Sequence, residues 1–155
     1  KSAEELRRTR MENRRQISAQ RTRDYREGTY RMAGGVPVKI TPDLPQFVRD
    51  YHDFYQTKRG YHPRSFGSTT GAPLTSLLAF MNMPINTYLE EIEAPVLMIH
   101  GEKAHSRYYS EDAFKRLQGK NKELYIVPGA VHTDLYDQMD KIPFDKIEAF
   151  FKANL

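Results

Sequence analysis

Side chains able to do acid–base chemistry gather in two short segments of the last third of the chain. The first segment is Gly101-Glu-Lys-Ala-His105, and the second is Gly129-Ala-Val-His132-Thr-Asp134. A neutral imidazole near pH 7 can take a proton from a hydroxyl group and return it to a leaving group. A loop histidine in isolation is more often structural, but His132 follows a strand-ending glycine by three residues. The pattern predicts that His132 is a general base.

The same two segments also contain a candidate metal site and a candidate loop anchor. His100, Glu102 and His105 form a His-x-Glu-x-x-His cluster, and both residue types bind zinc. This spacing is not the helical His-Glu-x-x-His motif, so we expect neither a metal nor another cofactor. Asp134 follows His132 by two residues, and aspartate commonly bonds to nearby backbone in turns. We expect Asp134 to fix the loop.

The elements that must position these side chains are two buried strands. Residues 96–99 and 124–127 are continuous apolar runs without alternation, which is typical of strands covered on both faces of a parallel sheet. Ligands of open α/β sheets bind in the loops beyond the carboxyl ends of such strands. Two strands cannot form a stable parallel sheet alone, so the pattern predicts the end of a larger sheet.

Helices are predicted after each strand. Ser110 is expected to cap a helix that carries Glu111 and Asp112 in its first turn and ends at Gly119. The last helix is expected to follow Pro143. Alternation of strand and helix over about 60 residues is typical of an α/β fold with a parallel sheet.

The first half of the chain is predicted to be helical. Residues 2–31 are rich in helix formers, and Ser2 with Glu5 three residues later matches a capping box. A second helix is expected to start with Thr41 as its N-cap, since apolar residues then recur at spacings of three and four. A third helix, outlined by leucines from residue 74, is expected to end near Pro84.

A long polar segment, residues 57–71, separates the second and third helices. It mixes turn-forming residues with aromatic and cationic side chains, so we expect an ordered loop that lines a pocket. Tyr61, His62 and Arg64 are candidates for binding an acidic substrate, together with the neighbouring Arg59. Solvated loop residues are the alternative. His105, in the C-terminal segment, is a further candidate for substrate binding.

Composition narrows the class of protein. Hydrophobic residues make up 39% and charged residues 28%, a low apolar share that predicts a partner surface completing the core. There is no cysteine, which excludes disulfides and thiolate metal sites and agrees with a reducing compartment. No run approaches the ~18 apolar residues of a membrane span. We expect a soluble, cytoplasmic protein that has no membrane partner.

The formal net charge of +4 is local. Residues 1–32 hold ten of the 24 Lys and Arg but five of the 20 Asp and Glu, so the remainder carries one net negative charge. An arginine-rich helix is one way to neutralise phosphates, which makes nucleic-acid binding an alternative function. Because acidic residues are interspersed, a solvated charged face is the favoured interpretation.

The strand ends Pro-Val-Leu-Met-Ile-His-Gly101 and Pro-Gly-Ala-Val-His132 resemble those of the C-terminal half of an α/β-hydrolase. Ser110-Glu-Asp-Ala-Phe and His132-Thr-Asp-Leu-Tyr-Asp137 look like a bacterial branch of serine hydrolases related to dienelactone hydrolases and X-Pro-peptidase-like esterases. The direct match covers roughly residues 84–155. The resemblance implies that residues 1–93 are a helical cap with connecting loops and that residues 94–155 are the last βαβα part of the hydrolase core.

In that family the triad runs serine, acid, histidine, and the serine lies on a Gly-x-Ser-x-Gly elbow. The chain has no such elbow. The resemblance therefore implies that an N-terminal half, either cleaved off or on another polypeptide, supplies the nucleophile. Ala104 and His105 occupy the places expected for the acid, so Glu102 is the nearest carboxylate able to orient His132. The predicted function is hydrolysis of a small ester-like substrate.

Two alternatives to this function stay open. A non-catalytic binding protein of the same fold is one, because the usual acid is missing from its expected place. Nucleic-acid binding through the basic N-terminal helix is the other. A homo-oligomer is compatible with all three.

Overall fold

The computed structural model describes residues 2–69 and 71–155. Contacts divide the chain into two compact units. Unit 1 comprises residues 1–39 and 55–84, and unit 2 comprises residues 40–54 and 85–155. The predicted boundary at residue 93 stays a prediction, but residues 40–54 group with the C-terminal part by contact.

Unit 1 is built on the long helix α1 (Ala3–Glu27). The predicted capping box is present, because the Ser2 hydroxyl accepts from the Glu5 backbone N–H and the Glu5 carboxylate accepts from the Ser2 N–H. The helix ends four residues before the predicted residue 31, at a Gly28 with a left-handed φ of 63°. Most of its side chains are exposed, as their polar pattern predicts.

The rest of unit 1 consists of short helices. The predicted loop contains α3 (Phe66–Thr69). The predicted third helix starts as a 3-10 turn, η1 (Leu74–Ser76), and continues as α4 (Leu77–Met81), so it ends before Pro84 as expected. The Arg14 guanidinium donates to the Met81 carbonyl at 3.4 Å, which ties α1 to α4.

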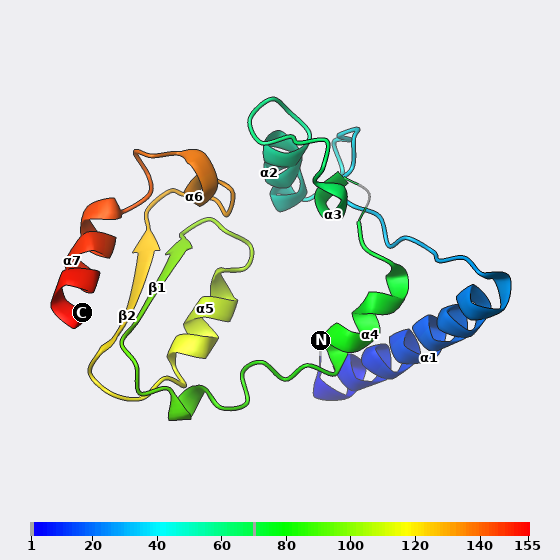
Figure 1. Cartoon of the computed structure of the whole chain (residues 1–155), viewed down its shortest axis with the longest axis horizontal. Coiled ribbons are helices and arrows are strands. Elements are labelled where there is room, and N and C mark those ends of the chain that lie inside the picture. Colours follow the sequence, from blue (N-terminus) through cyan, green and yellow to red (C-terminus); the bar gives the residue numbers. More distant parts are fainter. Residues whose placement is uncertain (1, 70) are drawn as a thin grey trace. The chain divides into compact units, whose positions relative to one another are not determined.

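Unit 2 contains a parallel pair of strands, β1 (Val96–Gly101) and β2 (Lys122–Val127), as predicted. The register pairs Val96 with Lys122 and Gly101 with Val127, so both strands end at the same edge. Figure 1 shows the two arrowheads side by side, with α6 (Asp134–Asp137) next to that edge. A mixed α/β fold is therefore observed.

Helices flank this pair of strands. α5 (Arg107–Phe114) contacts both strands, and the final helix α7 (Phe144–Asn154) begins directly after Pro143, as predicted. In the view of Figure 1, α5 and α7 lie on opposite sides of the strands. A short 3-10 turn, η2 (Leu89–Glu91), precedes β1. Strand side chains are mostly half-buried rather than buried, which suits a sheet whose covering is incomplete.

Two predicted helix starts were wrong. Ser106, not Ser110, precedes α5, so Ser110 lies inside the helix, and the helix ends at Phe114 well before Gly119. The reason is the tight turn after β1, in which the Arg107 N–H already donates to the Ala104 carbonyl.

The second error concerns α2 (Gln46–Tyr55), which does not start at Thr41. The Leu44 N–H donates to the Thr41 carbonyl at 3.2 Å, forming a turn, and the Thr41 hydroxyl bonds the Asp43 carboxylate instead of capping a helix. This bond lowers the pKa of Asp43. The helix starts only after Pro45, whose carbonyl accepts from the Val48 N–H.

No helix within residues 2–69 and 71–155 combines the length and apolar character needed to cross a membrane.

Candidate active site at the strand ends

The loops after β1 and β2 are fastened to each other by backbone. The Glu102 N–H donates to the Val127 carbonyl, and the Lys103 N–H donates to the Ala130 carbonyl, both at 2.9 Å. A Cβ atom on Gly101 would lie only 2.5 Å from the Ala130 carbonyl oxygen. Glycine is therefore required where the second loop crosses the end of β1, and this crossing brings His132 close to His100.

His132 lies just beyond this crossing and is half-buried. The backbone reverses at Gly129, whose φ of 68° suits glycine. On either side of the histidine, Ala130 and Thr133 are fully buried. The Thr133 hydroxyl donates to the Asp50 carbonyl of α2 at 3.4 Å, so this bond ties the loop to α2.

Aromatic rings surround the imidazole of His132. The ring of Tyr51 lies edge-on at a centroid distance of 5.5 Å, and that of Tyr136 lies edge-on at 5.4 Å. Phe47, one helical turn before Tyr51, stacks on His105 at 4.2 Å. The apolar stripe predicted for the second helix thus serves the site, because Phe47 and Tyr51 of α2 pack on its histidines.

Three imidazoles form a cluster. The ring centroids of His100 and His132 are 5.8 Å apart, and those of His105 and His132 are 6.3 Å apart. Among the described residues, no group of three His, Asp or Glu is arranged to hold a metal ion. Two of the three rings, His100 and His132, are instead linked through a hydroxyl group.

Two serines and two of the histidines, His100 and His132, form one chain of hydrogen bonds. The Ser106 hydroxyl lies 3.2 Å from Nδ1 of His132 and 3.1 Å from Nε2 of His100. The Ser110 hydroxyl lies 2.9 Å from Nδ1 of His100. Ser106 was not among the predicted site residues, and Ser110 was predicted to cap a helix rather than to lie inside it. The only available signal was their spacing of four, which lets a residue just before α5 and one inside it lie on the same side.

Burial and like charge act on the two inner histidines. Burial lowers the pKa of His132 from its ordinary value, and the neighbouring His100 and His105 lower it further. Burial also lowers the pKa of His100, followed by His105 and Arg107, while Glu111 opposes the shift. Both rings therefore favour the neutral form, the form that accepts a proton.

Neither nearby carboxylate binds His132. An Oε2 atom of Glu102 accepts from the Gly129 N–H at 2.7 Å, so this side chain fastens the second loop. Within the described part of the chain, no carboxylate forms a hydrogen bond or ion pair with His132. The proposed orienting role of Glu102 stays a prediction that no contact supports.

The expected loop-fixing role of Asp134 is confirmed. Its Oδ2 atom accepts from the Val131 N–H at 3.0 Å and pairs with the Lys141 ammonium at 2.7 Å. Its Oδ1 atom accepts from the Gln138 amide at 2.7 Å. Asp134 is 5% exposed, so its carboxylate is buried, while the Lys141 side chain stays partly solvated.

A small pocket of about 150 Å³ opens between the strand end and α6. His100, His132 and Tyr136 line it together with Ile99, Gly101 and Leu135. The space suits a small reacting group rather than a whole large substrate.

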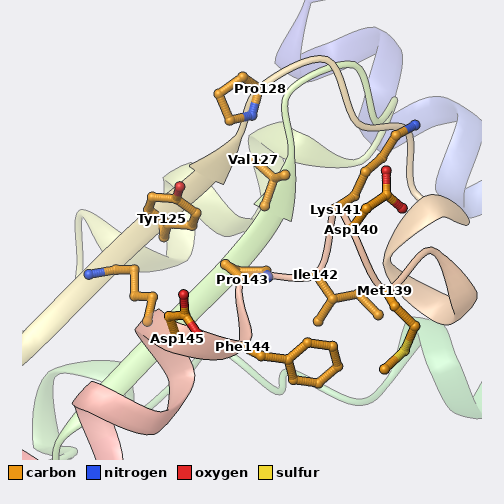
Figure 2. A pocket seen from close by; sticks show the side chains of 11 residues that line it. Tyr125, Val127, Pro128, Met139, Asp140, Lys141, Ile142, Pro143, Phe144 and Asp145 are labelled. Carbon is orange, nitrogen blue, oxygen red and sulfur yellow. The ribbon is translucent and has the colours of Figure 1, made fainter.

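A larger hollow of about 650 Å³ lies between β2 and the start of α7. Figure 2 shows Tyr125 and Val127 on one side of it and Pro143 and Phe144 on the other. Both lysines that line this hollow form ion pairs, Lys141 with Asp134 and Lys146 with Glu123. It carries no chemistry comparable to the histidine cluster.

The other predicted binding residues lie in unit 1. Tyr61 is 52% exposed and lines a hollow of about 590 Å³ with Gln56, Thr57 and Lys58, which agrees with a pocket-lining loop. The Arg64 N–H donates to Nδ1 of His62 at 3.1 Å, a contact within the loop. Substrate binding by Tyr61, His62, Arg64 and His105 stays a prediction.

The chain is similar in sequence to longer proteins that are uncharacterized. The uncharacterized protein PA2218 of Pseudomonas aeruginosa is 50% identical over 142 residues, which cover 90% of this chain and 38% of the relative. The uncharacterized protein YcjY of Escherichia coli is 29% identical over 118 residues, covering 76% of this chain and 38% of the relative. No family model matches the chain.

A solved structure shares the fold. The crystal structure of the hypothetical protein PA2218 from Pseudomonas aeruginosa superposes with a TM-score of 0.86 at 48% identity. The match covers 94% of this chain and 45% of that structure. The chain thus spans less than half the length of the relatives it matches, and none of their names states an activity.

Proposed function

We propose that this chain is part of a capped α/β serine hydrolase that cleaves small ester-like substrates, with His132 as the general base. The resemblance of its two strand ends to the C-terminal half of α/β-hydrolases motivates the fold assignment. Under this proposal, residues 1–93 belong to the cap and 94–155 to the core. An N-terminal region supplies the serine nucleophile and most of the oxyanion hole.

The observation that carries the proposal is the way His132 is held. Its Nδ1 atom is bonded to the Ser106 hydroxyl, while its Nε2 atom has no hydrogen-bond partner within residues 2–69 and 71–155. The ring lines a small pocket at the carboxyl ends of parallel strands. A general base needs this arrangement, with one nitrogen fixed and the other available to a hydroxyl group.

The relatives' greater length supports the missing-half part of the proposal. The chain accounts for 38% of each curated relative, which leaves room for the strands and the serine elbow that an α/β-hydrolase needs. The half-buried strands are consistent with this, because a parallel sheet is ordinarily covered on both faces.

The test is covalent labelling of the longest polypeptide that the gene encodes around this chain. A fluorophosphonate probe should label one serine, and His132→Ala should slow labelling and hydrolysis of a p-nitrophenyl ester by about a hundredfold to ten-thousandfold. His52→Gln, on α2, serves as the matched histidine control and should react like the unaltered protein. No serine labelling of the unaltered polypeptide would refute the enzyme proposal.

One observation favours a second candidate, a non-catalytic binding protein. His132 lacks the carboxylate that stabilises its charged form in most triads. A protein that binds ester-like ligands without turning them over would show saturable ligand binding and no reaction with the fluorophosphonate. The labelling experiment therefore separates the two candidates.

A further inference from the structure

In the described part of the chain, a hydroxyl group rather than a carboxylate contacts Nδ1 of His132. Three hydrogen bonds run in series from Nδ1 of His132 through Ser106 to His100 and on to Ser110. Ser106 precedes α5, yet its hydroxyl makes no capping bond to the helix. Serine is a favoured N-cap residue, so its use between two imidazoles instead is a notable feature of this site.

A serine hydroxyl has one proton to donate. If Nδ1–H of His132 donates to the Ser106 oxygen, the Ser106 O–H is free to donate to Nε2 of His100. His100 must then carry its own proton on Nδ1, where the Ser110 oxygen accepts it. This direction leaves Nε2 of His132 with the lone pair that a general base requires.

The reverse direction disables the base. If the Ser110 O–H donates to Nδ1 of His100, then Nε2–H of His100 donates to Ser106, and the Ser106 O–H donates to Nδ1 of His132. His132 then carries its proton on Nε2 and accepts none from a nucleophile. The tautomers of the two histidines are thus coupled through one hydroxyl group.

We propose that Ser106 and His100 are positioning residues that take the place of the triad acid, holding the proton of His132 on Nδ1 through uncharged hydrogen bonds. This inference rests on the proposed function. In the reaction, the nucleophile's hydroxyl proton passes to Nε2 of His132 while the Nδ1 proton stays in place. The leaving group then takes the Nε2 proton, and the chain of hydrogen bonds ends as it began.

Other elements offer no competing partner within the described residues. The titratable groups that face His132 are His100 from β1, His105 from the following loop, Tyr51 from α2 and Tyr136 from α6. The neighbouring acids are engaged elsewhere, Glu102 with Gly129 and Asp134 with Val131, Gln138 and Lys141. Ser106 is therefore the group that meets Nδ1.

The first experiment measures tautomers rather than activity. Nitrogen-15 NMR of histidine-labelled full-length polypeptide at pH 8 should show His132 and His100 protonated on Nδ1. Ser106→Ala should shift His132 toward the Nε2–H form, and Ser106→Thr, which keeps the hydroxyl group, should restore the original form. Ser76→Ala, which alters a local bond in η1, is the matched control and should change neither histidine. An unchanged His132 tautomer in Ser106→Ala would overturn the inference.

The second experiment links the network to catalysis. Ser106→Ala should slow fluorophosphonate labelling roughly five- to tenfold, the value of one neutral hydrogen bond. Ser106→Asp places a carboxylate beside Nδ1 and should raise the measured pKa of His132. Equal labelling rates for Ser106→Ala and the unaltered protein would overturn a positioning role. If no protein is labelled, the proposed hydrolase function fails, and the tautomer measurement still decides whether the network exists.

Discussion

His132 has two other imidazoles rather than a carboxylate beside it, and this affects how it responds to pH. Its pKa is lowered first by burial and then by His100 and His105, and burial also lowers the pKa of His100. In a triad with a carboxylate the opposite charge would raise it. His132 is therefore a weaker base, and it remains neutral in mildly acidic solution.

We predict that the acidic limb of the pH–rate profile lies below the ordinary histidine pKa of about 6.5. The reason is that a base with a lowered pKa loses its proton-accepting form only at lower pH. The measurement is kcat/KM for a p-nitrophenyl ester between pH 5 and 8. An acidic limb at or above 6.5 would contradict the prediction.

The same shifts predict a pH dependence of stability. Because the folded state holds His100 and His132 with lowered pKa values, the unfolded chain binds more protons below about pH 6.5. Stability is therefore complete above that pH and falls as the pH drops toward the folded pKa values. Chemical denaturation from pH 7.5 to 5 should show this loss, and the double variant His100→Gln, His132→Gln should show a shallower slope. The exposed His62→Gln is the control.

At the scale of elements, the site depends on two loops that touch through backbone. We predict that Gly101→Ala destabilises unit 2, because the added Cβ would meet the Ala130 carbonyl oxygen at 2.5 Å. The expected loss is roughly 1 to 3 kcal/mol, typical of overpacking. Gly67→Ala is the matched control, because a Cβ there meets nothing within 4 Å. Urea denaturation gives both values, and equal stability of the two variants would contradict the prediction.

The anchor of the second loop gives another prediction at this scale. Asp134→Ala leaves the Val131 N–H and the Lys141 ammonium without this carboxylate, and Asp134 is 5% exposed. We expect a loss of roughly 2 to 4 kcal/mol, less than for a fully buried pair because Lys141 is partly solvated. Asp112→Ala breaks an exposed pair with Lys115 and should change stability far less, because solvent screens exposed charges. Thermal and urea unfolding of both variants test the difference.

At the scale of the whole molecule, the small size of the parallel sheet predicts that its two strands are part of a larger sheet. Parallel pairs this small are marginal in water, and the relatives of the chain are more than twice as long. We predict that β1 amides exchange hydrogen at least about tenfold more slowly in the full-length polypeptide than in the 155-residue chain alone. Amides in the middle of α1, bonded within their own helix, are the internal reference. Equal β1 protection in both would argue against a larger sheet.

The amino-acid sequence by itself determined the elements with strong local signals. The apolar runs predicted both strands, Pro143 predicted the start of α7, and Ser2 with Glu5 predicted the capping box of α1. His132 was singled out because its position after Gly129 is a local pattern. The loop-fixing role of Asp134 was also local, since its Val131 partner is three residues away.

Only the tertiary structure decided what surrounds His132. Ser106, 26 residues away in sequence, reaches its Nδ1 atom because α5 starts directly after the turn that follows β1. Tyr51 and Phe47 come to the histidines from α2, far earlier in the chain. Such contacts depend on strand register and loop crossing, which no local spacing encodes. Local periodicity specifies which side chains face a core. The packing of distant elements selects the neighbours of a histidine, and these neighbours determine which ring nitrogen carries the proton.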